Sequence, residues 1–148
     1  MRTIASITAI VVGIIMAIAG VATWVVVSTT LGDQKITVSD DAAHFAGGSV
    51  NTPWEAYAQA DVIAKHAKEI AGGKTYAELP QDDPNRDTVM TASFLQASLF
   101  TSVLAFGVAA MAVGLGIVFI LLGWALMSTA SDLRSTPAKE TVPAEAAA

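Results

Sequence analysis

Two histidines and no cysteine limit the chemistry that this sequence could perform. His44 stands three residues after Asp41, and an imidazole beside a carboxylate can bind a metal ion. A usable site needs three or four converging ligands, and the sequence around His44 offers no further set. We therefore expect a solvated turn there, in which aspartate side chains bond to the nearby backbone, and no metal or cofactor.

The second histidine, His66, belongs to no recognisable catalytic motif. It lies one helical turn after Val62, without a Ser or Cys nucleophile placed beside it in a known pattern. Ser49 or Ser93 could join a histidine only through the fold, which scattered residues do not reveal. The sequence also lacks a phosphate-binding loop, a dinucleotide-binding fingerprint and an H-E-x-x-H zinc motif. We expect a protein that is not an enzyme; an enzymatic role would require a polar cluster around His44.

The elements that would position these residues include two long uncharged stretches. Of the 148 residues, 53% are hydrophobic and 14% are charged, and no charged residue falls within 3–32 or 88–131. Ile4–Val27 and Ala97–Met127 each exceed the ~20 apolar residues with which a helix crosses a bilayer. The first stretch has no polar face and is about twice as long as the apolar region of a signal peptide. We predict a mainly α membrane protein, a two-helix transmembrane hairpin with a small, mostly helical extracytoplasmic segment between the spans.

This prediction divides the chain into four regions and orients them. The regions are an N-terminal tip with the first transmembrane helix (1–31), an extracytoplasmic segment (32–87), a second transmembrane helix with an outer extension (88–130) and a disordered cytoplasmic tail (131–148). Arg2, Arg134 and Lys139 flank the spans on one side, so the positive-inside rule places both termini in the cytoplasm of a multi-pass plasma-membrane protein. The central region holds ten acidic and five basic residues, which argues against nucleic acid and anionic lipid headgroups as partners.

Small residues recur along both spans at spacings that favour helix packing. Residues four apart stack on one face of a helix, and small side chains let another helix approach closely. The predicted packing interface consists of Ala5, Ala9, Gly13 and Ala17 on the first span and Gly107, Ala110 and Gly114 on the second. A neighbouring face of the second span carries Ala112 and Gly116, which indicates more than one neighbour. The alternative, that glycine and alanine are simply frequent in membrane helices, stays equally open.

The central region begins with a weak strand signal and continues with a strong helix signal. Alternation over 35–39, followed by glycines 47–48, indicates a short strand that returns as a loose hairpin. Thr52 and Glu55 have capping-box spacing around a proline, so a helix should begin there, with these two residues as its cap. This helix should end near Ala71, before a glycine pair.

A further helix should begin at Asp83-Pro84, before the second uncharged stretch. Nothing from Asn85 onward interrupts it, and to Met127 it would measure on the order of 65 Å. The second span should therefore start outside the bilayer, as a stalk against which the shorter helix can pack.

Several runs of residues closely resemble a family of small two-span actinobacterial membrane proteins. These runs are ITVSDDA (36–42), AYAQADVI (56–63), GGKTYAEL (72–79) and TVMTASFLQASLFTSV (88–103), and the likeness extends to Met127. Similar chains have been labelled aromatic ring-opening dioxygenases, which need non-haem iron held by two histidines and a carboxylate, a set that this pattern does not supply. A similar small subunit is associated with the actinobacterial supercomplex of cytochrome bc and cytochrome oxidase. The resemblance thus implies an accessory role and no particular functional residues.

Two functional hypotheses follow from the sequence. The leading one is a non-catalytic accessory subunit of a larger membrane complex, with other integral membrane subunits and the lipid bilayer as its partners. The rival is a cell-envelope sensor or small-ligand-binding protein, and a pocket lined by Trp54, Tyr57 and Tyr76 would favour it.

Overall fold

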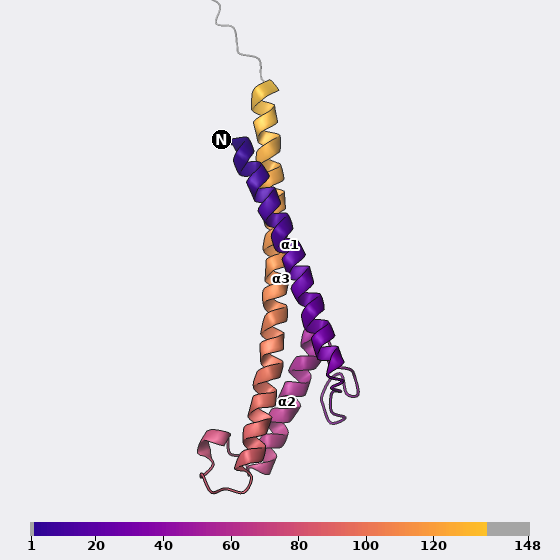
Figure 1. The fold of residues 1–148 in the computed structure, drawn as a ribbon, viewed down its shortest axis with the longest axis vertical. Coiled ribbons are helices and arrows are strands. Elements are labelled where there is room, and N and C mark those ends of the chain that lie inside the picture. The colour runs from indigo at the N-terminus through magenta and orange to yellow at the C-terminus, as the bar shows by residue number, and fades with distance from the viewer. Residues whose placement is uncertain (1, 136–148) are drawn as a thin grey trace, which may run out of the picture.

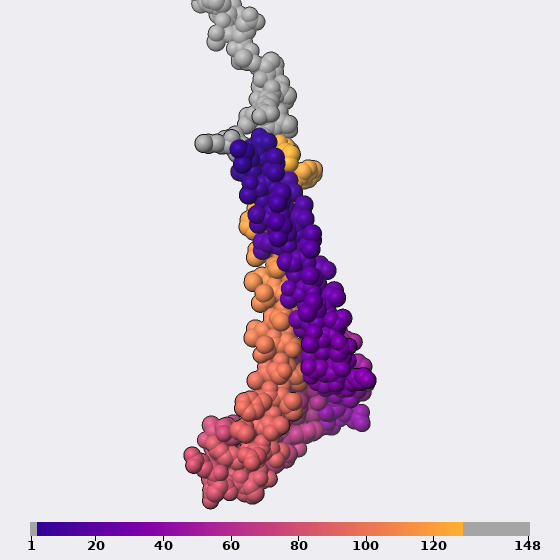
Figure 2. Space-filling model, in the orientation of Figure 1, coloured from indigo at the N-terminus to yellow at the C-terminus, as the bar shows by residue number. Residues whose placement is uncertain are grey.

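The computed structural model describes residues 2–135, which form three α-helices and one short 3-10 helix (Figure 1). In chain order these are α1 (Arg2–Asp33), α2 (Pro53–Ile70), η1 (Tyr76–Glu78) and α3 (Arg86–Ser135). α1 and α3 lie side by side in opposite directions as a narrow rod, and α2 and η1 widen one end of it (Figures 1 and 2). We call this wider part the α2 end. α3 continues through Ser135, so residues 131–135 are helical, and the rest of the predicted disordered tail lies outside the described residues.

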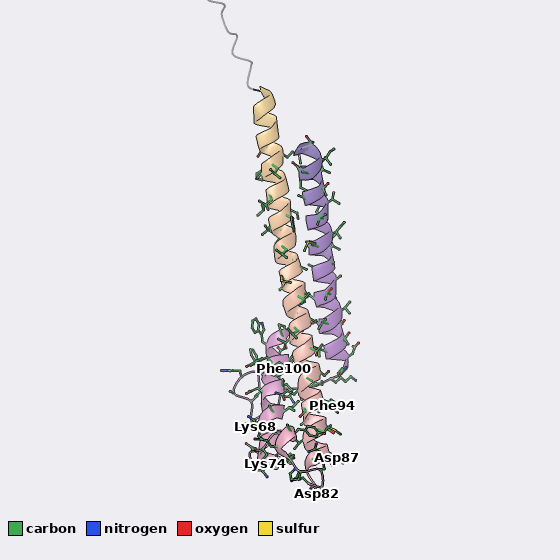
Figure 3. The ribbon with its side chains drawn as sticks, turned by 90° about the vertical axis from the view of Figure 1, so that its left-hand side faces the viewer. Lys68, Lys74, Asp82, Asp87, Phe94 and Phe100 are labelled. Carbon is green, nitrogen blue, oxygen red and sulfur yellow. The ribbon has the colours of Figure 1, made fainter. Side chains whose placement is uncertain are left out.

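Both long helices have the length and composition of membrane spans. Thr3–Asp33 comprises 31 residues and Arg86–Ser128 comprises 43, and each is long and apolar enough to cross a membrane. Large apolar side chains project outward along both helices; Ile18 is 65% exposed and Leu104 is 69% exposed. Four charged residues, Lys68, Lys74, Asp82 and Asp87, lie at the α2 end (Figure 3).

α1 and α3 touch along a row of small residues that we call the glycine seam. Its members face one another in three rungs: Ser6 with Gly123, Gly13 with Gly116, and Gly20 with Ala109. A Cβ atom added to Gly13 would lie 2.6 Å from the carbonyl oxygen of Gly116, and one on Gly20 would lie 2.7 Å from that of Ala109. Successive rungs are seven residues apart on both helices, the repeat that keeps the same positions in contact where two helices wind around one another.

Larger side chains replace the glycines toward the α2 end. Trp24 meets Phe106 edge to face, with 4.7 Å between the ring centroids, and Phe106 is almost completely buried. Leu31 and Leu99 continue this core. Because bulkier residues separate helix axes, α1 and α3 diverge here (Figure 1).

α2 packs against α3 beyond the point of divergence. Ala56 and Ala60 are fully buried and carry small side chains, so α2 can lie close to its neighbour. The helix begins at Pro53, after Thr52, and the Glu55 carboxylate accepts hydrogen bonds from the Thr52 backbone N–H at 2.9 Å and from its hydroxyl at 2.8 Å. Caps of this kind stabilise a helix by about 1 kcal/mol.

α2 ends at Ile70, and the two following glycines turn the chain. Gly72 and Gly73 have φ values of +63° and +88°, which residues with a Cβ rarely adopt. The backbone N–H of Gly73 donates to the carbonyl of Lys68 at 2.7 Å and so satisfies the helix end.

The strand predicted over 35–39 is reduced to an isolated bridge between Thr37 and Ser49. The chain still returns as a loose hairpin, since the Val38 N–H donates to the Gly48 carbonyl at 2.9 Å. Val38 and Val50 are both buried against the neighbouring helices, and this burial holds the loop in place. The described residues contain no β-strand beyond this bridge, because the pairing has no third segment to extend it.

α3 starts at Arg86, two residues after the proline at which we expected it. The Asp83 carboxylate accepts the backbone N–H of Asn85 at 2.8 Å, which holds the intervening residues in a turn. Arg86 then lies 4.3 Å over the ring of Tyr76 and donates to the carbonyl of Leu79, so the start of α3 is joined to η1.

The glycine seam yields a test by substitution. Gly13→Leu should push α1 and α3 apart by several Å, because the new side chain would overlap the α3 backbone. Spin labels on cysteines introduced at the exposed residues Val12 and Ile117 report this separation in the cysteine-free chain. Ile15→Leu, at an exposed position, is the matched control. Equal distance distributions in the two variants would show that close backbone approach is not what joins the helices.

Candidate functional site

The structure places the predicted packing residues of α1 at different depths. Gly13 lies in the glycine seam, Ala9 and Ala17 are half-buried beside it, and Ala5 is exposed. Gly13 and Ala17 of the predicted four-residue row both lie against Gly116, whereas the closest contacts along the whole seam recur every seven residues, because a four-residue row drifts around the helix. Sequence reasoning missed Gly20 and Gly123, although each lies seven residues from a glycine of the seam.

The predicted packing residues of α3 lie outside the glycine seam. Gly107, Ala110 and Gly114 are all exposed, and we call them the open glycine face. A Cβ atom built on Gly107 or Gly114 would meet nothing within 4 Å. These two glycines are also seven residues apart, the same spacing as Gly116 and Gly123 in the glycine seam.

His66, and not His44, contacts the carboxylate of Asp41. The Nε2 atom of His66 lies 2.7 Å from Oδ2 of Asp41, and both side chains are 45% exposed. The contact ties the loop before α2 to the helix itself. The hydrogen bond from His66 holds the pKa of the Asp41 carboxyl below its usual value.

His44 instead faces Phe45, with 6.4 Å between the ring centroids. Within residues 2–135, no three His, Cys, Asp or Glu side chains come together in a way that could hold a metal ion.

The three aromatic residues of the rival hypothesis do not share a pocket. Trp54 and Tyr57 line a shallow hollow of about 170 Å³, together with His44 and Asp61. Tyr76 lies under the guanidinium of Arg86, at the opposite end of α2. Tyr57 packs edge to face on Phe100 of α3, with 5.8 Å between the ring centroids.

A larger groove, which the sequence did not reveal, lies where α1, α2 and α3 meet. We call it the three-helix groove; its volume is about 450 Å³. Its lining residues are Val26, Val27, Thr30, Leu31, Gln34, Ile36, Gln59, Ile63, Leu95, Ser98, Leu99, Thr101, Ser102 and Ala105. They come from the last turns of α1, the loop that follows it, the middle of α2 and a segment of α3, so no single stretch of sequence predicts the groove.

Comparison with known protein families, curated proteins and solved structures found no match to this chain. The similarity to small actinobacterial membrane proteins therefore stays a prediction from the residues alone.

The contact between Asp41 and His66 predicts a change in acid titration. Because the contact lowers the pKa of Asp41 in the folded chain, it stabilises the fold above the ordinary aspartate value of about 3.9 and is lost as the pH falls through the lowered value. His66→Ala should therefore raise the pKa of Asp41 toward its ordinary value. Carboxyl carbon NMR of the protein in detergent micelles measures it, with His44→Ala as the control. An Asp41 titration that does not move in His66→Ala would contradict the contact.

Proposed function

We propose that this chain is a non-catalytic accessory subunit of a larger membrane complex. The observation that supports this best is the open glycine face on α3. α3 carries two rows of glycines at seven-residue spacing, and α1 occupies only the row in the glycine seam. In a bilayer, apolar burial gives helices no reason to associate, so packing at small residues must supply the attraction. A helix of another subunit could approach α3 at Gly107 and Gly114 as α1 does at Gly116 and Gly123.

The surface of the rod supports a location in the membrane. Large apolar side chains such as Ile18 and Leu104 stand exposed along both long helices, a surface that is strongly disfavoured in water. Lipid would cover them. α1 and the part of α3 beside it would then form a transmembrane hairpin, with Arg86 and the first turns of α3 outside the bilayer.

The distribution of charge supports an orientation for this hairpin. The 32–87 segment is acidic, whereas basic residues flank the opposite ends of the spans. We propose that the α2 end is extracytoplasmic and both termini are cytoplasmic, in the plasma membrane.

The proposed complex is a respiratory one, the supercomplex of cytochrome bc and cytochrome oxidase. This part of the proposal is supported only by the family resemblance described above. The alternative function, a cell-envelope sensor or small-ligand-binding protein, is favoured by the hollow lined by Trp54 and Tyr57. Because Tyr76 lies apart from these two residues, the sensor or ligand-binding function is the weaker candidate.

Cysteine labelling tests the orientation, because the natural chain has no cysteine. A cysteine at Ser49 should react with a membrane-impermeant thiol reagent in intact cells, whereas one at Ser131 should react only after the cells are opened. The reverse pattern would place the α2 end in the cytoplasm.

The open glycine face predicts a selective loss of partners. Replacing both Gly107 and Gly114 with leucine should reduce recovery of partner subunits by about tenfold, which corresponds to about 1.4 kcal/mol of binding free energy. Recovery is measured by affinity purification in a mild detergent, followed by mass spectrometry for subunits of cytochrome bc and cytochrome oxidase. The control replaces the exposed Val108 and Val118 with leucine.

The spin-label distance between positions 12 and 117 should stay unchanged in the double glycine variant, since neither glycine touches α1. Recovery equal to that of the valine control would argue against docking at this face. If the unaltered protein purifies without subunits of cytochrome bc or cytochrome oxidase, the proposed complex is rejected.

A further inference from the structure

The three-helix groove has a position and lining that point to a lipid. Its Leu95 and Ala105 are ten residues apart on α3, so the groove extends along the helix for about 15 Å. One end, at Val26 and Ala105, joins the exposed apolar surface of the long helices. The other end, at Gln34 and Gln59, lies at the α2 end, beyond the proposed spans. The groove therefore crosses the level at which the hydrocarbon of the bilayer would give way to headgroups.

The polar atoms along the groove are arranged unequally. Midway along the groove, the hydroxyls of Thr30 and Thr101 donate to carbonyls of their own helices, Val26 at 2.7 Å and Ala97 at 2.8 Å. These residues thus present mainly their methyl groups to the groove. Val27 and Leu99 provide further apolar lining.

A carboxamide stands at the polar end of the groove. The Oε1 atom of Gln59 accepts the backbone N–H of Ser39 at 2.9 Å, which fixes the side chain against the loop. Its amide nitrogen donates to no group in the part of the chain that the structure describes. Gln59 is half-buried, so this nitrogen is a ready donor to a carbonyl or hydroxyl oxygen in the groove.

The lining offers no counter-charge to a charged ligand. None of the groove residues has an ionisable side chain. A phosphate or an ammonium group placed here would lose hydration without gaining a counter-charge, which is costly. A volume of about 450 Å³ and a mainly apolar lining with a few polar groups are typical of small-molecule sites.

We propose that the three-helix groove binds one membrane lipid with an uncharged head group, of the diacylglycerol type. One of its two acyl chains lies along Val27 and Leu99, the other extends into the bilayer, and an ester carbonyl or hydroxyl of the head accepts a hydrogen bond from the Gln59 amide. This inference depends on the membrane location proposed above, but not on docking at the open glycine face.

Native mass spectrometry of the full-length protein in detergent micelles tests the proposal, with dioleoylglycerol as the probe and dioleoylphosphatidylglycerol as the charged comparison. The unaltered protein should retain one dioleoylglycerol and bind the charged lipid at least about tenfold more weakly. Ser98→Trp should abolish retention, because the indole would fill the groove. Ala97→Trp, at the adjacent exposed residue outside the lining, should bind as the unaltered protein does.

Gln59→Leu should weaken retention by about tenfold, since it removes the donor to the head group. Circular dichroism checks that each variant keeps its helices; if Ser98→Trp loses them, Thr101→Trp at another exposed lining residue takes its place. Equal retention in the groove-filling variant and Ala97→Trp would show lipid bound only around the rod and would overturn the proposal. So would a preference for the charged lipid, or no retention by the unaltered protein. The cysteine-labelling experiment tests the membrane location separately, so the two failures can be told apart.

Discussion

The backbones of α1 and α3 approach so closely at Gly13 and Gly116 that a methyl group on either would come within 2.6 Å of the carbonyl oxygen of the other. A side chain on either glycine would prevent this approach, and in two further rungs a single glycine faces the backbone of Ser6 or Ala109. Close contact at the narrow end and bulky residues such as Phe106 at the other make the helices diverge. α2 packs against α3 beyond this point, and residues of α1, α2, α3 and the loop after α1 line the three-helix groove.

The glycines of α3 lie in two different environments. Gly116 and Gly123 contact α1, whereas a Cβ atom on Gly107 or Gly114 would meet nothing within 4 Å. Inside a bilayer, a vacant row of this kind offers contact between backbones, which a row of leucines would not. α3 thus has more small-residue surface than its own chain covers, as a helix that packs against another subunit would.

The sequence predicted the elements that depend on local signals. The boundaries of α2 followed from Thr52, Pro53 and the glycine pair, since capping and positive φ act within a few residues. The sequence predicted the packing face of α1 less well. Small residues recur on α1 at more than one spacing, and only the position of α3 decides which of them lie in the contact. The contact of His66 with Asp41 joins residues 25 apart, and the three-helix groove draws on three segments. Neither has a local signal, so neither could be read before the fold was known.

α3 is one unbroken helix of 50 residues, about 75 Å long, with no proline to bend it. α2 and η1 are fastened to its first turns, and α1 is fastened farther along it. One continuous helix therefore carries both sets of contacts, and the position of the α2 end relative to α1 is set through α3.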